Sequence, residues 1–468
     1  GGTQNDLGRG LALDASRNVH VVGDFYGTVD FDPSPTVTYN LTSQTANYND
    51  IFVLKLDLNG NFRWARSFGS ANVDLGNDIA VDGAGNVYTT GIYRSGTNDF
   101  DPGAGTTTLP FAGGTQDLFL SKLSPAGDLI WAEGIGGDQT DTATAVAADA
   151  DGNVYVTGDF RGTVDFDPSP TATYNLTSLG ADTPSNPPSD IFVAKYDAAG
   201  ALVWAESMGG PSLDFARDLT LDSAGNVYLT GLFVILGDFD PDPTDTYTLV
   251  GSFNDTTAGN DVFVVKLGTD GRLAWAQNIG TSVNAGTVMG NDMGNGIAVD
   301  GRGRVAIAGS FTSTIDLDPD PVATFDVATT GSTGAFIVQW AQPQMTGSFS
   351  AEPAADGYAI DAGGDGTFET VATTDDMIVT GVGFAPYPDY MGLIEFDLTG
   401  IDPRALVQAA ALTADVLVLQ YNSLHPQVDV AVYGYAGDGT LSPADATVPA
   451  TLLGQATNVQ PVTLTIPL

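Results

Sequence analysis

The sequence has no cysteine and few basic residues. Its 468 residues include 15 lysines and arginines against 57 aspartates and glutamates, which gives a formal net charge of −42. Without cysteine there is no disulfide framework, thiolate nucleophile or cysteine-based metal site. An acidic surface repels phosphate groups and lacks the basic segments that dock on anionic membranes. No apolar run is long enough for a transmembrane helix. We therefore expect no nucleic-acid partner and no membrane insertion.

Histidine and the common catalytic motifs are also scarce. The two histidines, His20 and His425, lie far apart in the sequence. No nucleophile elbow, phosphate-binding loop or dinucleotide fingerprint occurs in a suitable context. Carboxylate pairs can hydrolyse glycosides, but here every pair is repeated, whereas catalysis needs one asymmetric site. The sequence therefore predicts a protein that is not an enzyme, and a glycan hydrolase or lyase is the weakest alternative.

One unit recurs five times along the first three quarters of the chain. Segments 24–43 and 159–178 are identical at 18 of 20 positions, so the units arose by duplication. Each unit contains about four runs in which apolar and polar residues alternate, as in "GLALD", "NVHVVGDF", "DIFVLKL" and "FRWARSF". Repeated four-stranded sheets of this kind form a β-propeller. We expect an all-β protein whose residues 1–344 form a five-bladed β-propeller.

The repeats also resemble a known family. "GNVYVTG", "DIFVAK" and "WAESMGG" resemble the bacterial β-propeller repeats whose family name refers to seven blades. The resemblance covers residues 1–342 and implies a bacterial protein. This chain departs from the family in having five units, each with a long excursion between the second and third strands.

The fifth unit is incomplete. "GAFIVQW" aligns with the third strand of the other units, but Ser348 stands where a Trp-Ala strand is expected. The blade would then have three strands and an open edge, which invites another strand. Residues 345–380 of the same chain could fill the edge, or three strands could suffice. A neighbouring protomer could instead donate the strand and build a head-to-tail polymer.

A second pattern follows the boundary segment "AQPQMTGSFSAEPAADG". Residues 345–468 contain several candidate strands, which predicts a β-sandwich. "GLIEFDLTGI", "ALTADVLVL" and "VYGYAGDGTLSPAD" resemble the DNRLRE-type jelly-roll modules of secreted bacterial proteins. That resemblance implies a structural or carbohydrate-binding appendage without catalytic activity.

Two sets of aspartates are candidate calcium ligands, because calcium prefers hard oxygen ligands and paired carboxylates repel each other unless solvated or bridged. The alternative to calcium binding is a solvated strand face for the first set, the Asp-x-Asp-Pro pairs. For the second set, the ring aspartates, the alternative is hydrogen bonds to local backbone N–H groups. The Asp-x-Asp-Pro pairs are Asp30 and Asp32, Asp99 and Asp101, Asp165 and Asp167, Asp238 and Asp240, and Asp316 and Asp318. The ring aspartates, each eight residues before the aspartate that ends a first strand, are Asp6, Asp74, Asp141, Asp214 and Asp292.

The sequence as a whole predicts a non-catalytic, secreted or cell-surface bacterial structural protein that is stabilised by Ca²⁺. It would build an extracellular assembly through self-association, including a fibre joined by strand donation between protomers. The alternative from another class is a carbohydrate-binding adhesin with an extracellular glycan as its partner.

Overall fold

The computed structural model describes residues 1–180, 188–254, 257–280, 290–319, 324–329 and 332–340, together with the backbone of seven later strands. The chain divides into two compact units, Gly1–Gln342 and Pro343–Leu468. The described residues contain strands and no helix, which confirms the expected all-β class. Within them, no helix is long and apolar enough to cross a membrane.

The strands of the first unit form five larger antiparallel sheets. The first sheet contains β1 (Leu7–Leu13), β2 (Val19–Tyr26), β5 (Asn49–Leu56) and β6 (Phe62–Ser70). The second contains β7 (Leu75–Val81), β8 (Val87–Tyr93), β10 (Asp117–Leu123) and β11 (Leu129–Gly137). The third contains β12 (Thr142–Ala148), β13 (Val154–Phe160), β16 (Asp190–Tyr196) and β17 (Leu202–Met208). The fourth contains β18 (Phe215–Leu221), β19 (Val227–Val234), β24 (Asn260–Leu267) and β25 (Leu273–Ile279). The fifth contains β26 (Met293–Val299), β27 (Val305–Phe311) and β30 (Gly334–Trp340).

Short strands form the excursion between the second and third strands of each repeat. They are β3 (Thr28–Asp30), β4 (Asn40–Thr42), β9 (Asn98–Asp99), β14 (Thr163–Asp165), β15 (Asn175–Thr177), β20 (Leu236–Asp238), β21 (Thr248–Val250), β22 (Phe253–Asn254), β23 (Thr257–Ala258), β28 (Thr314–Asp316) and β29 (Asp326–Ala328). Four of these excursions pair with the end of the preceding sheet: β9 with β6, β14 with β11, and Asp238 and Asp316 with Gly209 and Gly280. The second to fifth repeats are therefore each connected to the repeat before them through the excursion.

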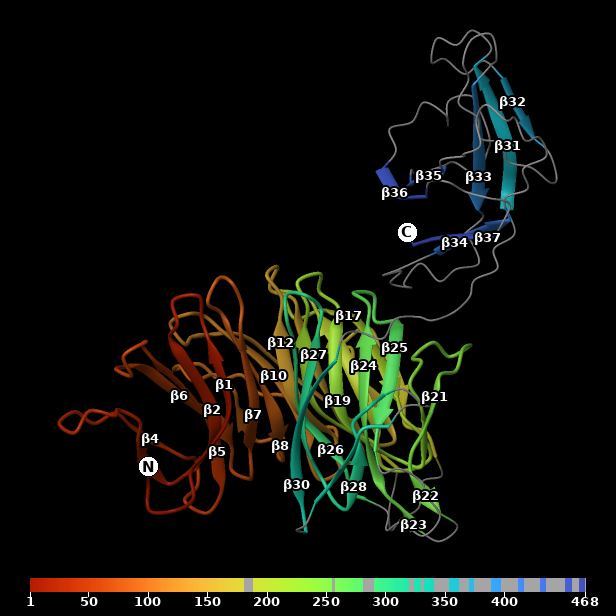
Figure 1. Cartoon of the computed structure of the whole chain (residues 1–468). Helices are drawn as coiled ribbons and strands as arrows, with labels where there is room; N and C mark the ends of the chain where they lie inside the picture. Colours follow the sequence, from red (N-terminus) through yellow and green to blue (C-terminus); the bar gives the residue numbers. More distant parts are fainter. Residues whose placement is uncertain are drawn as a thin grey trace. The chain divides into compact units, whose positions relative to one another are not determined.

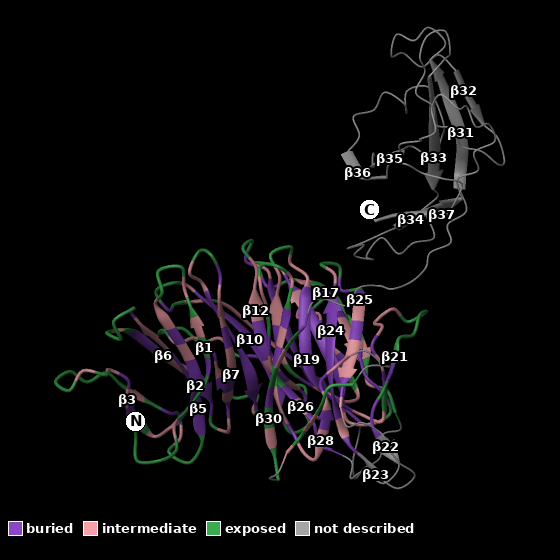
Figure 2. Ribbon diagram, viewed as in Figure 1, coloured by how far each residue is buried: buried purple, intermediate pink, exposed green. Residues whose placement is uncertain are grey.

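The sheets follow one another in sequence order, from red to teal in Figure 1. The first strands lie against one another in the series β1, β7, β12, β18, β26. A shared apolar core fills each of the four junctions; for example, Ile51 and Val53 of the first sheet lie in one cluster with Ile79 of the second. Figure 2 shows the effect of this packing: the central strands β19 and β24 are almost wholly buried.

The fifth sheet has three strands among the described residues, with β30 paired to β27. The position expected for a fourth strand, around Ser348, lies outside the described residues, as does the predicted boundary at 344/345. The second unit contributes β31 (Pro353–Asp361), β32 (Thr370–Thr373), β33 (Asp389–Phe396), β34 (Ala411–Asp415), β35 (Val430–Gly434), β36 (Thr451–Ala456) and β37 (Thr463–Pro467). These pair as β32-β31-β33, β34-β37 and β35-β36, and the rest of the predicted sandwich lies outside the described residues.

Candidate functional site

The ring aspartates connect consecutive sheets through backbone hydrogen bonds. Asp141 is fully buried: its Oδ2 accepts the Gly137 N–H of the preceding sheet at 2.7 Å, and its Oδ1 accepts the Arg161 N–H of its own sheet at 3.2 Å. Asp214 repeats this arrangement with Gly210 at 2.7 Å and Val234 at 3.1 Å. These carboxylates therefore hold each first strand to the end of the sheet before it.

Asp74, Asp6 and Asp292 show the same bonding with local variations. Asp74 accepts both the backbone N–H and the hydroxyl of Ser70. Asp6, which is half-buried, accepts the Gly2 and Tyr26 N–H groups. Asp292 is fully buried and accepts the Thr312 N–H at 3.3 Å.

A second buried aspartate lies beside three of the ring aspartates. These junction aspartates, at the start of the third strand, are Asp50, Asp117 and Asp190. In each, Oδ2 accepts one backbone N–H, as from Leu179 to Asp190 at 2.6 Å, whereas the buried Oδ1 has no hydrogen-bond partner within the described structure. An unpartnered buried carboxylate oxygen is costly, so each junction favours a bound proton or cation.

Electrostatics agree with this geometry. Burial, with the neighbouring ring aspartate as a further cause, raises the pKa of Asp50 and Asp117 to about 7 and that of Asp190 to about 8. Burial raises the pKa of Asp214 to about 7. Two carboxylates that share a site repel each other when both are ionised, so near neutral pH each pair favours one negative charge over two.

Glycine makes room for the pairs. An added Cβ at Gly209 would lie 2.7 Å from Asp190 Oδ1 and 2.9 Å from Asp214 Oδ2, and the residue has φ +150°. Gly69 occupies the same place beside Asp50 and Asp74, with φ +155°. The glycine that ends the Trp-Ala strand is therefore part of the site.

The Asp-x-Asp-Pro pairs are arranged differently. In the first pair, Asp30 Oδ1 accepts the Asp32 N–H at 3.0 Å and the Tyr39 N–H at 2.8 Å, and Asp32 Oδ1 accepts the Ser34 N–H at 2.9 Å. The first aspartate of every other pair also accepts two backbone N–H groups: Asp99, Asp165, Asp238 and Asp316. These carboxylates therefore fix the turn of each excursion.

The fifteen predicted ligands do not gather into one site. Across the part of the chain that the structure describes, no three histidine, aspartate or glutamate side chains converge so that they could hold a metal ion. A calcium ion at any of these positions would need backbone oxygens or water in addition to one or two carboxylates.

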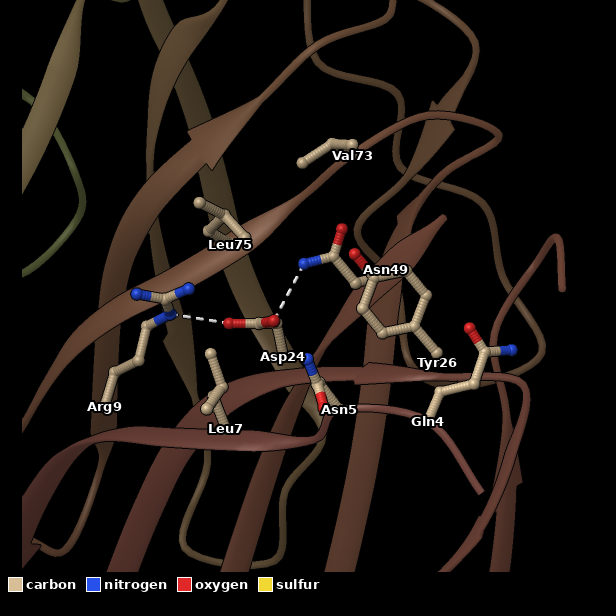
Figure 3. Close-up of a pocket in the computed structure, with 9 residues that line it drawn as sticks. All are labelled: Gln4, Asn5, Leu7, Arg9, Asp24, Tyr26, Asn49, Val73 and Leu75. Atoms are coloured by element: carbon tan, nitrogen blue, oxygen red, sulfur yellow. Dashed lines mark hydrogen bonds and ion pairs between the residues drawn. The ribbon is translucent and has the colours of Figure 1, made fainter. Parts of the chain in front are cut away.

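A polar pocket of about 450 Å³ lies between the first sheet and the start of β7 in the second sheet (Figure 3). The buried Asp24 carboxylate accepts the Arg9 Nε–H at 2.5 Å and the Asn49 Nδ2–H at 2.8 Å. The ring of Tyr26 and the amide of Gln4 lie on one side of these groups. The pocket offers hydrogen-bonding groups and an aromatic face, but no paired nucleophile and base.

His20, the histidine among the described residues, is fully buried. Its Nε2 lies 3.4 Å from Asp14 Oδ2, and its ring contacts that of Trp64 edge-on at 6.1 Å between centroids. Burial lowers the pKa of His20, so the ring is neutral near pH 7. This environment suits a packed residue.

Sequence reasoning missed the junction aspartates. The available signal was the aspartate that opens "DIFVLK", "DLFLSK", "DIFVAK" and "DVFVVK" in four units, together with its replacement by Gly334 in the fifth. An aspartate before an apolar strand resembles an ordinary strand end, so its proximity to a ring aspartate appears only when the sheets are packed.

Comparison with known proteins supports propeller-type repeats. The family described as beta-propeller repeat (SBBP) matches residues 63–91, which run from β6 to β8. An uncharacterized WD repeat-containing protein, L264, of Acanthamoeba polyphaga mimivirus is 27% identical over 329 residues, covering 60% of this chain and 23% of that protein. The regulatory protein FlaEY of Caulobacter vibrioides is 29% identical over 155 residues, covering 32% of this chain and 16% of that protein. The chain thus matches less than a quarter of the length of either relative.

Proposed function

We propose that this chain is a non-catalytic structural protein of a bacterial cell-surface or extracellular assembly. In this proposal the first unit is a five-bladed β-propeller whose first and fifth blades are not in extensive contact among the described elements, and the second is a β-sandwich of the DNRLRE type. The five sheets in series, their apolar junctions and the propeller-repeat match support the first part. The repetition of the carboxylate sites supports a structural role, since the ring aspartates and the Asp-x-Asp-Pro pairs accept backbone N–H groups in repeat after repeat.

The observation that carries the proposal is the edge of β30. In the other four sheets the third strand lies between two neighbours, whereas β30 has β27 as its one neighbour among the described residues. Its sequence, GAFIVQW, contains no charge and no proline, the two devices that commonly protect an exposed edge. Such an edge accepts a further strand through backbone hydrogen bonds.

Electron microscopy of the purified chain tests this proposal, with filaments as the expected result. A peptide with the sequence of residues 202–208, a fourth strand of the third sheet, should compete for the edge and shorten the filaments. A scrambled peptide of the same composition is the control. Separate particles at every protein concentration would contradict assembly, and filaments indifferent to the peptide would contradict strand donation.

Calcium is the second part of the proposal. The unpartnered oxygens of the junction aspartates support it, because a cation would neutralise each buried pair at pH values where no proton is bound. We expect calcium to raise the melting temperature at pH 8, and chelation to lower it, more strongly than magnesium at equal concentration. Equal melting temperatures with calcium and with a chelator would contradict this part.

The pocket between the first sheet and the start of β7 favours a second candidate, a carbohydrate-binding adhesin. Amide groups together with a tyrosine ring suit the hydroxyl groups and the apolar face of a sugar. A glycan array probed with the chain should then show binding that is lost on Tyr26→Ala. An array without binding would leave the structural role as the better reading.

A further inference from the structure

Each internal junction between sheets is built from two faces that recur in every repeat. The exit face of a sheet looks toward the next sheet and includes Val53, Leu120, Val193 and Val264 on the third strands, all 0% exposed. The entry face looks toward the preceding sheet and includes Ile79, Val146, Leu219 and Ile297 on the first strands, which are 4 to 7% exposed. At each junction the entry residue lies in one apolar cluster with the exit residues before it.

Within the described residues, the same faces of the first and fifth sheets are exposed. Leu11 holds the entry position on β1 and is 65% exposed, while Leu13 beside it is 58% exposed. Ile337 holds the exit position on β30 and is 83% exposed. Among the described elements, β1 makes no extensive contact with the fifth sheet, and β30 makes none with the first sheet. Figure 2 shows much of β1 and β30 as exposed or intermediate.

The two exposed faces also fit each other in size. The entry face of the first sheet presents leucines, Leu11 and Leu13. The exit face of the fifth sheet presents small residues around Ile337: Ala306 stands where three of the other repeats have tyrosine, and Ala308 and Ala335 are exposed. Bulky side chains against small ones allow two sheets to approach closely.

We propose that the exit face of the fifth sheet docks on the entry face of the first sheet of a second copy of this chain. This inference rests on the proposed assembly function and names its contact: a sheet face, in addition to the β30 edge. The interface continues the four junctions already present in the first unit. Because the two faces differ, the contact is head-to-tail and extends into a chain of copies.

Charge sets the conditions for this contact. Two copies with a formal charge of −42 each repel one another, so association should strengthen as salt screens the repulsion. Sedimentation velocity of the full chain at 0.5 M NaCl should therefore show dimers and larger species that grow with protein concentration. A wild-type chain that stays monomeric at all concentrations would overturn the inference, including the case in which the two faces close within one chain.

Single lysine substitutions locate the contact. Leu11→Lys and Ile337→Lys each remove one face and should raise the concentration for half-association roughly tenfold or more. Val203→Lys is the matched control, because Val203 is 52% exposed on β17 of the third sheet, which contributes to neither face. Melting temperatures measured on dilute protein, if unchanged, show that the variants fold. If Ile337→Lys does not fold, Ile337→Ser takes its place.

Mixing the two variants gives the sharpest test. Leu11→Lys keeps an intact exit face and Ile337→Lys keeps an intact entry face, so their mixture should form a 1:1 dimer and nothing larger. A mixture that stays monomeric would overturn head-to-tail docking. If both variants still form filaments, the proposed face docking is wrong but the proposed assembly holds. If the wild type forms dimers but no filaments, the proposed assembly is wrong but the face docking holds.

Discussion

At the residue scale, the main feature is a carboxylate pair repeated at consecutive junctions. The ring aspartate of each pair has its oxygens hydrogen-bonded to backbone N–H groups, and the junction aspartate has one oxygen left over. The same residue type therefore has two roles that depend on its neighbours: one fixes geometry, and the other makes stability depend on protonation.

Asp190→Asn should stabilise the chain at pH 8 by on the order of 1–3 kcal/mol, because the amide can donate a hydrogen bond where the ionised carboxylate leaves an oxygen unpaired. The pKa of Asp190 is about 8 in the folded state against 3.8 ordinarily, so the folded chain binds more protons between these values. The free energy of unfolding therefore falls as the pH rises from about 4 to about 8. Urea unfolding at pH 5 and pH 8 measures both effects.

The control for this prediction is Asp128→Asn, which removes the same charge from an exposed side chain. It should leave the pH slope unchanged. Aspartates with a lowered pKa do not confuse the result: the Asn61 side chain holds the pKa of Asp57 below its ordinary value, so its contribution is lost only below about pH 4. Equal slopes in the wild type and Asp190→Asn would contradict the role of the junction pair.

Gly209→Ala should destabilise the chain by about 1–3 kcal/mol, since the added methyl group meets two carboxylate oxygens and the backbone has φ +150°. Gly83→Ala is the matched control, with no atom within 4 Å of the added carbon. Thermal unfolding of both variants measures the difference. A neutral Gly209→Ala would mean that the carboxylate pair moves apart without cost.

At the scale of elements, tryptophan connects the last strand of one sheet to a turn of the next. Trp131 Nε1 donates to Ala198 O at 3.2 Å, and Lys122 Nζ donates to the same oxygen at 3.0 Å. Gly200 in that turn has φ +88° and lies against the Trp131 ring. The repeated Trp, Lys and Gly thus form one inter-sheet contact.

Trp204→Phe should cost about 1 kcal/mol, because it removes the hydrogen bond from Nε1 to Thr269 O at 3.2 Å while keeping an aromatic ring. Trp275→Phe serves as the comparison, since its Nε1 has no hydrogen-bond partner within the described residues. Denaturant midpoints of the two variants test the prediction. A larger loss for Trp275→Phe would show that ring packing, and not the hydrogen bond, dominates at this position.

At the scale of the whole molecule, the charge of −42 opposes the compact state. Repulsion among exposed carboxylates weakens as salt shortens the screening length to a few ångströms. The apolar junctions must offset this repulsion, and buried apolar side chains form a core at each of the four.

Raising NaCl from 20 mM to 500 mM should therefore increase the melting temperature by at least about 2 °C. Differential scanning calorimetry at low protein concentration measures the shift without interference from association. Sucrose at equal osmolality is the control, because it leaves charge repulsion in place. A melting temperature that falls with salt would show that local ion pairs, and not overall repulsion, dominate the electrostatics.

Much of the fold follows from the sequence, because strand alternation and the duplicated unit are local patterns. The all-β class, the order of strands in each repeat and the three described strands of the fifth unit agree with the expectation from alternation. The roles of the aspartates could not be derived in this way. Asp30 fixes a turn and Asp141 holds two sheets together, and the spacing of aspartates in the sequence does not predict which of these roles a given aspartate has.

The sequence by itself determined the repeat, the charge and the absence of cysteine chemistry, since these depend on residue identity and local periodicity. The tertiary structure alone decided which aspartates meet, because Asp190 and Asp214 belong to different repeats and approach only when two sheets pack. It also separated Leu11 from Ile79: both are apolar residues in the same position of the repeat, but Ile79 packs against the first sheet, whereas Leu11 is exposed within the described structure.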